Sequence, residues 1–275
     1  KKKVKELLGL TMLVYEYGNT FKLKNDETVE QFLEKCNKEE IKLDDTCMKI
    51  LNDFTECSPM GTVELFISDP DTDIQVGITK SEINKRVCVI FRGSESRSDW
   101  YYDLMITKKK ISNNVYVHSG FYYQLHTNNV YDNIVSKVNE ILIENPDYEV
   151  FVTGHSLGAA LSTLFGYEFA LTTEKKISVV SFASPRVGNW NFKEDFEKRS
   201  NLCHFRITNN RDIITATPMY KYYHCGKNIS LYDKNFVVSE CNAISWFRYT
   251  IFYCWSVADH GVKLYYDRLL KNVWE

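Results

Sequence analysis

The stretch YEVFVTGHSLGAALSTLFGYEFA, residues 148–170, decides the fold. Its first part, residues 148–153, is rich in β-branched and aromatic side chains and predicts a strand. Its last part, residues 157–170, is rich in Ala and Leu and predicts a helix. Residues 154–158 have the pattern G-x-S-x-G and leave room only for a tight turn. The stretch therefore predicts a strand, a sharp turn and a helix, with Ser156 at the centre of the turn.

The tight turn has chemical consequences for Ser156. It forces this residue into strained backbone geometry and leaves its hydroxyl projecting above the sheet. Gly154 and Gly158 have no Cβ, so neighbouring elements can approach the turn closely. The helix that starts at Leu157 points backbone N–H groups and a partial positive charge toward an oxyanion forming beside the serine. These features favour Ser156 as a nucleophile, and the simpler alternative is a serine that caps an ordinary helix.

A serine nucleophile needs a base to take its proton and a carboxylate to orient that base. In α/β-hydrolases the acid and then the histidine follow the serine, and three histidines follow Ser156: His204, His224 and His260. His204 lies inside a strand pattern, and His224 lies in a Tyr-rich segment that we expect to be an edge strand. His260 precedes a helix predicted for residues 261–270, so it lies on a loop, where a mobile imidazole belongs. We therefore expect His260 to be the base.

Asp212 is the best candidate for the acid. It lies in a turn directly after the strand predicted for residues 203–207, at the carboxyl end of the strand, where the sites of α/β proteins assemble. Asp259 is adjacent to His260, and neighbouring side chains rarely face each other. Two other carboxylates remain as competitors, Asp195 and Asp233.

Outward from residues 148–170, predicted strands and helices alternate. The predicted strands are 63–67, 74–78, 86–91, 148–153, 177–182 and 203–207, and the longest predicted helix is 120–144. This alternation predicts the α/β class, with a mainly parallel central sheet flanked by helices. The start of the chain has helical patterns at 4–17, 28–38 and 44–56 and no evident chemistry. We expect one domain over residues 1–275, with residues 1–60 as a helical N-terminal extension packed on it.

The composition excludes several classes of function. A formal net charge of −2 does not indicate the basic surface that binds nucleic acid. No run of about 18 apolar residues predicts a membrane-spanning helix. The eight cysteines have no C-x-x-C spacing and no nearby paired histidines, so we expect no metal and no cofactor. The chain begins with Lys1 rather than Met, which suggests a processed product, secreted or luminal if a signal peptide was removed. Localisation, disulfide pairing and oligomeric state stay open.

Several motifs, taken in their order along the chain, resemble the class 3 lipases, the fungal-lipase-like branch of the α/β-hydrolases. The resemblance covers about residues 62–270. The motifs that carry it are FRGS at 91–94, DW at 99–100 with DL at 103–104, HSGF at 118–121, TGHSLG at 153–158, SPRVGN at 184–189, the acid turn at 209–218, and His260 with Tyr265.

This resemblance implies a triad of Ser156, Asp212 and His260 that acts on carboxylic esters through an acyl-enzyme. The family pattern implies that the backbone N–H groups of Ser94 and Leu157 form the oxyanion hole, with the Ser94 hydroxyl as a further donor. His155 belongs to the motif, and we expect it to point away from the pocket and to pack. The chain departs from the family in the acid turn, where the first proline after Asp212 comes only at position 218.

The resemblance also places a lid after Ser94. Its residues 95–99 are polar and are followed by three aromatic residues that we expect to contact substrate: Trp100, Tyr101 and Tyr102. A lid made for oil–water interfaces has a broader apolar face, so we expect weak interfacial activation. The aromatic segment 243–257 is either a lining of an acyl groove, a membrane contact or ordinary core.

Three functions remain open. The first is an acylglycerol lipase or esterase, whose partner is a lipid or other ester and which contacts a lipid or membrane surface transiently. The second is a phospholipase A1, which the polar lid favours. The third belongs to a different class, an inactive hydrolase fold that serves as a binding module, because fold alone does not establish activity.

Overall fold

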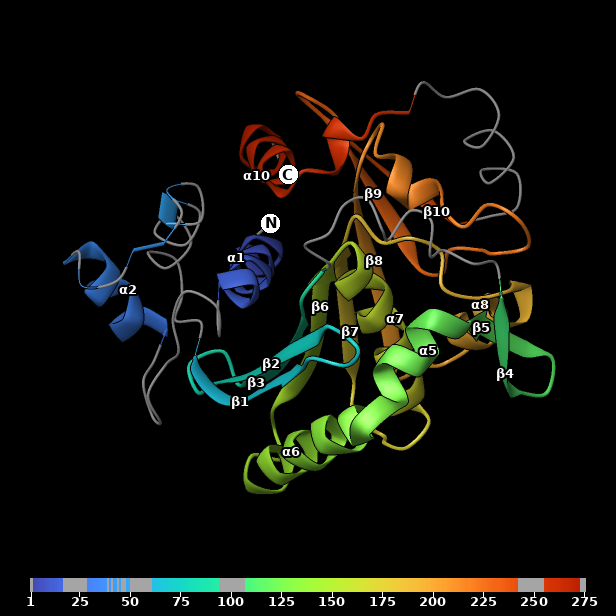
Figure 1. Ribbon diagram of the computed structural model, residues 1–275, viewed down its shortest axis with the longest axis horizontal. Helices are drawn as coiled ribbons and strands as arrows, with labels where there is room; N and C mark the ends of the chain where they lie inside the picture. The colour runs from blue at the N-terminus through green and yellow to red at the C-terminus, as the bar shows by residue number, and fades with distance from the viewer. Residues whose placement is uncertain are drawn as a thin grey trace.

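The computed structural model describes residues 2–16, 29–38, 40, 42–43, 45, 48–49, 61–93, 107–241 and 255–272. At its centre lies an eight-stranded sheet with the order β1-β2-β3-β6-β7-β8-β9-β10 (Figure 1). The five central strands run parallel: β3 (Arg86–Phe91), β6 (Glu149–His155), β7 (Ile177–Phe182), β8 (Leu202–Asn209) and β9 (Lys227–Leu231). Antiparallel strands flank them on both sides: β1 (Thr62–Asp69), β2 (Ile74–Ser81) and β10 (Phe236–Glu240).

Helices cover both faces of this sheet, as the alternating pattern predicts (Figure 1). One apolar cluster joins the sheet to α5 (Ser119–His126), α6 (Val130–Glu144), α7 (Leu157–Ala170) and α8 (Trp190–Glu197). A second cluster joins the opposite face to α1 (Lys2–Glu16) and α10 (Val262–Lys271). Along α7 every residue except Glu168 is buried, so this helix lies in the interior and holds the turn before it rigidly.

The remaining elements are short. A separate hairpin consists of β4 (Lys108–Ser112) and β5 (Val115–His118), and α2 (Val29–Asn37) lies in the N-terminal region. Three 3₁₀ turns are η1 (Thr127–Asn129), η2 (Ile213–Ala216) and η3 (Ala258–His260). The last two matter for function because η2 begins directly after Asp212 and η3 ends at His260.

Two predicted elements are wrong. The helix predicted over 120–144 is interrupted between α5 and α6, because Asn128 and Asn129 adopt left-handed φ values of 52° and 60°. Asparagine tolerates this conformation better than most residues, and the chain turns there. The Tyr-rich segment 220–224 is a turn with one isolated bridge, from Tyr223 to Gly188, and the sheet continues through β9 and β10. The helix predicted over 44–56 lies mostly outside the described residues.

α1 is attached to the sheet by apolar packing and by one buried ion pair. Leu7, Leu8 and Leu10 of α1 lie in the second cluster and are almost fully buried. Glu6 and Arg86 form an ion pair of 2.7 Å between Oε2 and Nη1, with both side chains at 2% exposure or less. The prediction of one domain over the whole chain stays a prediction. No helix among the described residues is long and apolar enough to cross a membrane.

Candidate active site

The turn between β6 and α7 has the strained geometry that the G-x-S-x-G pattern predicts. Ser156 adopts φ 59° and ψ −123°, and its backbone N–H donates to the carbonyl of Phe182 at 3.0 Å. A Cβ at Gly154 would lie 2.4 Å from the carbonyl oxygen of Gly158. A Cβ at Gly158 would lie 2.3 Å from the carbonyl oxygen of Phe91. Both glycines are therefore required by the close approach of β3, β6 and α7, and Ser156 is held at the end of β6.

His260 lies beside this serine. Its Nε2 is 2.9 Å from Ser156 Oγ, within hydrogen-bond reach for proton transfer. Its Nδ1 is 3.0 Å from each carboxylate oxygen of Asp212. The side chain of His260 is 18% exposed, whereas that of Asp212 is fully buried. The imidazole of His260 is therefore partly accessible, and the carboxylate of Asp212 is shielded from water.

Asp212 is held by the elements on either side of it. Its Oδ1 accepts the backbone N–H of Ile214 at 3.0 Å and so caps η2. Its backbone forms an isolated parallel bridge with Ser256, four residues before His260. The turn that carries the acid and the segment that leads to the base are therefore joined directly. This connection fixes the distance between the carboxylate and the imidazole.

Tyr265 holds the second oxygen of the same carboxylate. Its hydroxyl donates to Asp212 Oδ2 at 2.7 Å and accepts the backbone N–H of Asn209 at 2.9 Å. Burial and the neighbouring Asp212 carboxylate raise the pKa of the Tyr265 phenol well above its usual range, so it stays a donor. The sequence singled out Tyr265 only as part of the terminal motif, and its contact with Asp212 is a finding of the structure.

His155 does more than pack, so the interpretation of it as a packing residue was incomplete. Its Nε2 lies 3.0 Å from the carbonyl oxygen of His260. A carbonyl only accepts, so this Nε2 carries the hydrogen. The other nitrogen, Nδ1, lies 3.1 Å from the hydroxyl of Tyr15 on α1, which donates to it when the ring is neutral. A chain of two hydrogen bonds therefore connects α1 to the backbone of His260. Sequence patterns held no signal for Tyr15, which is 140 residues from His155.

The competing candidates are engaged elsewhere. His204 is buried in β8 against Ser181 Oγ at 2.8 Å, and burial lowers its pKa to about 3, as a neutral sheet residue requires. His224 is bonded to neither Ser156 nor Asp212 in the described contacts. The three other carboxylates bind arginines: Asp259 and Asp233 bind Arg268, and Asp195 binds Arg199.

Of the two residues predicted to form the oxyanion hole, the structure describes only Leu157. Leu157 is the first residue of α7, where an N–H has no partner within the helix and can donate to an oxyanion. Ser94 and the predicted lid contacts Trp100, Tyr101 and Tyr102 lie outside the described residues. The geometry thus unites a hydroxyl, an imidazole, a buried carboxylate and a helix N-terminus, which is the set that acyl transfer needs.

Comparisons with known proteins show which proteins this chain resembles. Residues 88–222 match the family model of class 3 lipases. A secreted mono- and diacylglycerol lipase from Penicillium cyclopium is 31% identical over 162 residues, covering 58% of this chain and 52% of that protein. A chloroplastic phospholipase A(1) from Arabidopsis thaliana is 33% identical over 158 residues, covering 50% of this chain and 35% of that protein. The chain thus spans about half the length, or less, of these curated relatives.

A solved structure extends the likeness of fold to nearly the whole chain. The triacylglyceride lipase of Rhizomucor miehei aligns with a TM-score of 0.72, over 94% of this chain and 91% of that chain, at 21% sequence identity. The α/β-hydrolase fold predicted from the sequence is therefore confirmed. The matched segment contains the β6–α7 turn and the turn after β8, the two places where the sequence predicted the nucleophile and the acid. The resemblance to the class 3 lipases that the sequence motifs predicted is confirmed over residues 88–222.

Proposed function

We propose that the protein hydrolyses carboxylic esters of lipids, with acylglycerols as the first substrate class. The observation that supports this most strongly is the alignment of Ser156 Oγ, His260 Nε2 and the Asp212 carboxylate at 2.9–3.0 Å. Ser156 attacks the acyl carbonyl while His260 takes its proton, and His260 then gives that proton to the departing alcohol. Water, activated by the same imidazole, releases the acid from the acyl-enzyme. The Asp212 carboxylate stabilises the imidazolium that forms.

The oxyanion of each tetrahedral intermediate forms at the start of α7. The N–H of Leu157 is one donor in this proposal, and the family pattern makes Ser94 the other. Removing one such donor lowers the turnover rate by roughly 10²–10³ in serine hydrolases. No cofactor enters the proposed reaction, because every proton transfer uses Ser156, His260 and water.

A second candidate, phospholipase A1 activity, uses the same three residues on a lipid with a charged head group. The Arabidopsis relative named phospholipase A(1) supports it, as does the polar sequence of residues 95–99. We also propose that the protein contacts a lipid surface transiently and that it is secreted or luminal. The Penicillium relative named as secreted supports the latter.

Covalent labelling tests the proposed nucleophile. A fluorophosphonate probe is expected to label the wild-type protein at Ser156, and Ser156→Ala is expected to abolish labelling. Ser162→Ala is a matched control, because Ser162 lies in the buried helix α7 that follows Ser156 and bonds only the carbonyl of Gly158 in the described contacts. The control variant keeps full labelling if the proposal holds. If the folded wild-type protein is not labelled, the hydrolase proposal is wrong and the inactive binding module is favoured.

The substrate class is tested by hydrolysis of a matched series. Mono-, di- and triacylglycerols and a phosphatidylcholine, all with the same acyl chain, are compared at equal concentration, together with p-nitrophenyl esters of graded length. Faster release of fatty acid from the acylglycerols supports the lipase proposal. Faster release from the sn-1 position of the phospholipid supports the second candidate, and activity on short p-nitrophenyl esters alone identifies an esterase.

A further inference from the structure

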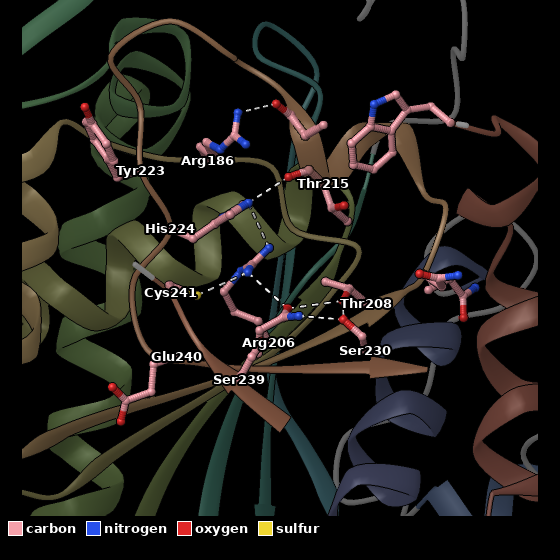
Figure 2. A pocket seen from close by; sticks show the side chains of 15 residues that line it. Arg186, Arg206, Thr208, Thr215, Tyr223, His224, Ser230, Ser239, Glu240 and Cys241 are labelled. Carbon is pink, nitrogen blue, oxygen red and sulfur yellow. Dashed lines mark hydrogen bonds between the residues drawn. The ribbon is translucent and has the colours of Figure 1, made fainter. Parts of the chain in front are cut away.

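A cavity next to the turn that carries Asp212 contains two buried arginines. It has a volume of about 70 Å³ and lies between the ends of β8 and β9 and the turn that carries Asp212 (Figure 2). Arg206 of β8 and Arg186 of the loop after β7 both line it, with 3% and 2% of their surfaces exposed. Asn209 and Thr215, on either side of Asp212, line it as well. Ester hydrolysis as proposed above does not use this cavity.

The guanidinium group of Arg206 is bonded to neutral acceptors only. Its Nη1 donates to Asn228 Oδ1 at 3.1 Å and points to Cys241 Sγ at 3.5 Å. Its Nη2 is 3.4 Å from the carbonyl oxygen of Ser184, which is a long contact. Its Nε is buried and has no hydrogen-bond partner among the described residues. These contacts leave part of the donor capacity of the guanidinium unused.

His224 does not accept a hydrogen bond from the unused donors of Arg206. Its Nε2 lies 3.0 Å from Arg206 Nη2 and also 2.7 Å from the carbonyl oxygen of Thr215 (Figure 2). The carbonyl only accepts, so the hydrogen of the ring lies on Nε2 and points to Thr215. That nitrogen then has no lone pair for Arg206. Burial and the charge of Arg206 lower the pKa of His224 well below its usual range, so the ring is neutral.

No carboxylate among the described residues balances the charge of Arg206. None of the ion pairs within the described part of the chain includes it. Glu240 is the only acidic residue among the described residues that line the cavity. It is exposed, and in Figure 2 its carboxylate points away from Arg206. A buried guanidinium keeps its proton, so a positive charge out of water requires an anionic partner.

Arg186 adds a second positive charge to the same space. Its Nη1 donates to the carbonyl of Pro218 at 3.1 Å and also contacts the carbonyl of Ala216. Burial and the charge of Arg206 lower the pKa of Arg186 to about 9. The two guanidinium groups therefore repel each other, and an anion between them would relieve both the repulsion and the burial of charge.

We propose that this cavity binds a small oxyanion, a phosphate or a carboxylate group, between Arg206 and Arg186. Guanidinium groups match the oxygen spacing of both groups with paired hydrogen bonds. The hydroxyls of Ser230 and Ser239 line the same cavity and supply neutral donors. A volume of about 70 Å³ has room for a handful of ordered waters or one small oxyanion. The ligand is therefore a free ion or the charged end of a larger molecule.

Cys241 provides a local probe of occupancy in the wild-type protein. It is half-buried, lines the cavity and lies beside Arg206, whereas Cys203 is an exposed thiol that does not line this cavity. The rate of alkylation by iodoacetamide is measured at each cysteine by mass spectrometry, with phosphate, acetate or chloride added at constant ionic strength. We expect phosphate or acetate to slow alkylation of Cys241 at least about five-fold and to leave Cys203 unchanged.

The three anions separate the outcomes. Protection of Cys241 by phosphate alone assigns a phosphate group, by acetate alone a carboxylate, and by both the shared oxyanion chemistry. Equal protection by chloride overturns the oxyanion assignment, and unchanged rates with all three overturn the site. This measurement uses no ester substrate, so its outcome is independent of the proposed hydrolase function.

A substitution tests whether Arg206 is needed to bind the anion. Phosphate is expected to raise the Tm of the wild-type protein and of the control Arg199→Gln. Arg199 follows α8, pairs with Asp195 and does not line the cavity. Arg206→Gln is expected to lose this shift. An equal Tm increase in Arg206→Gln contradicts the proposal. If Arg206→Gln does not fold, Ser230→Ala replaces it, with a reduced protection of Cys241 by the anion as the expected result.

Discussion

At the scale of single residues, several hydrogen bonds fix the orientation of the Asp212 carboxylate. It faces His260 with both oxygens, caps η2 through Ile214 and accepts the Tyr265 hydroxyl. A fully buried carboxylate needs this many partners, because an acceptor without a donor is costly out of water. The same bonds leave the carboxylate one orientation, and this orientation presents His260 Nε2 to the serine.

Tyr265→Phe tests this arrangement. The change removes one hydrogen bond to a charged group, a loss of about 1.5–3 kcal/mol, and leaves the N–H of Asn209 without its acceptor. We expect kcat/KM for a p-nitrophenyl ester to fall roughly ten-fold or more, together with a lower midpoint of unfolding. Tyr167→Phe is the control, because it also removes a tyrosine–aspartate bond, to Asp195, far from the triad. If both variants lose stability but keep wild-type kcat/KM, Tyr265 does not orient the acid.

Each residue of the proposed triad has a local signal in the sequence. Ser156 has its turn motif, Asp212 follows a strand end, and His260 lies on a loop before a helix. The residues that position them could not be predicted in this way. Tyr15 contacts His155 across 140 residues of sequence, and Tyr265 contacts Asp212 across 53. Only the folded sheet brings such pairs together, and one sequence contains no record of the pairing.

At the scale of elements, α1 reaches the candidate active site although it is about 140 residues from Ser156 in the sequence. Tyr15, one residue before the last residue of α1, donates to His155, which in turn donates to the backbone of His260. The same hydroxyl would lie 2.2 Å from a Cβ at Gly93, so the end of α1 also closely approaches the end of β3. The helix therefore contributes to the position of η3 and its histidine.

Tyr15→Phe measures that contribution. The ring packing is kept, and one neutral hydrogen bond of about 1 kcal/mol is lost. We expect kcat to fall about five-fold with little change in KM, because the substrate-binding surface is unchanged and only the base is less well held. Tyr123→Phe is the control, since Tyr123 is exposed on α5. A fall in Tm with unchanged kcat would show that the contact is structural only.

The sequence predicts the bounds of strands and helices with a dense apolar pattern. It does not predict elements that depend on pairing between distant segments. The patterns at 86–91, 177–182 and 157–170 coincide with β3, β7 and α7, whose burial is nearly complete. The hairpin strands β9 and β10 have only five residues each, and β10 has no buried side chain, so they gave no such signal. The break between α5 and α6 depends on two asparagines in left-handed conformation, which periodicity alone does not detect.

At the scale of the whole molecule, the buried ion pair between Glu6 and Arg86 determines how firmly α1 is attached. Glu6→Ala leaves the Arg86 charge buried without this partner, and breaking a buried pair in this way costs about 3–5 kcal/mol. We expect the free energy of unfolding in guanidinium chloride to fall by that amount. Lys3→Ala is the control, because it breaks the exposed pair of Lys3 with Glu149 and is expected to change nothing measurable. A similarly small effect of Glu6→Ala would mean that α1 is held by apolar packing alone.

Stability should also depend on pH through His204 and His224. Burial lowers the pKa of His204 from 6.5 to about 3, and lowers that of His224 well below 6.5. Between pH 6.5 and the folded pKa, the unfolded chain therefore binds a proton that the folded chain does not. By linkage, stability is fully present above pH 6.5 and falls as the pH drops below it, approaching about 1.4 kcal/mol per pH unit for each histidine.

His204→Gln isolates one of these contributions. Glutamine does not titrate, so the variant should lose free energy of unfolding less steeply than the wild-type protein between pH 6.5 and pH 4.5. The difference in slope should approach about 1.4 kcal/mol per pH unit at the lower end, because all carboxylates are common to both proteins and cancel. Denaturant unfolding at four or five pH values measures both slopes. Parallel slopes would mean that His204 titrates in the folded protein as it does in the unfolded chain, which its burial and its bond to Ser181 argue against.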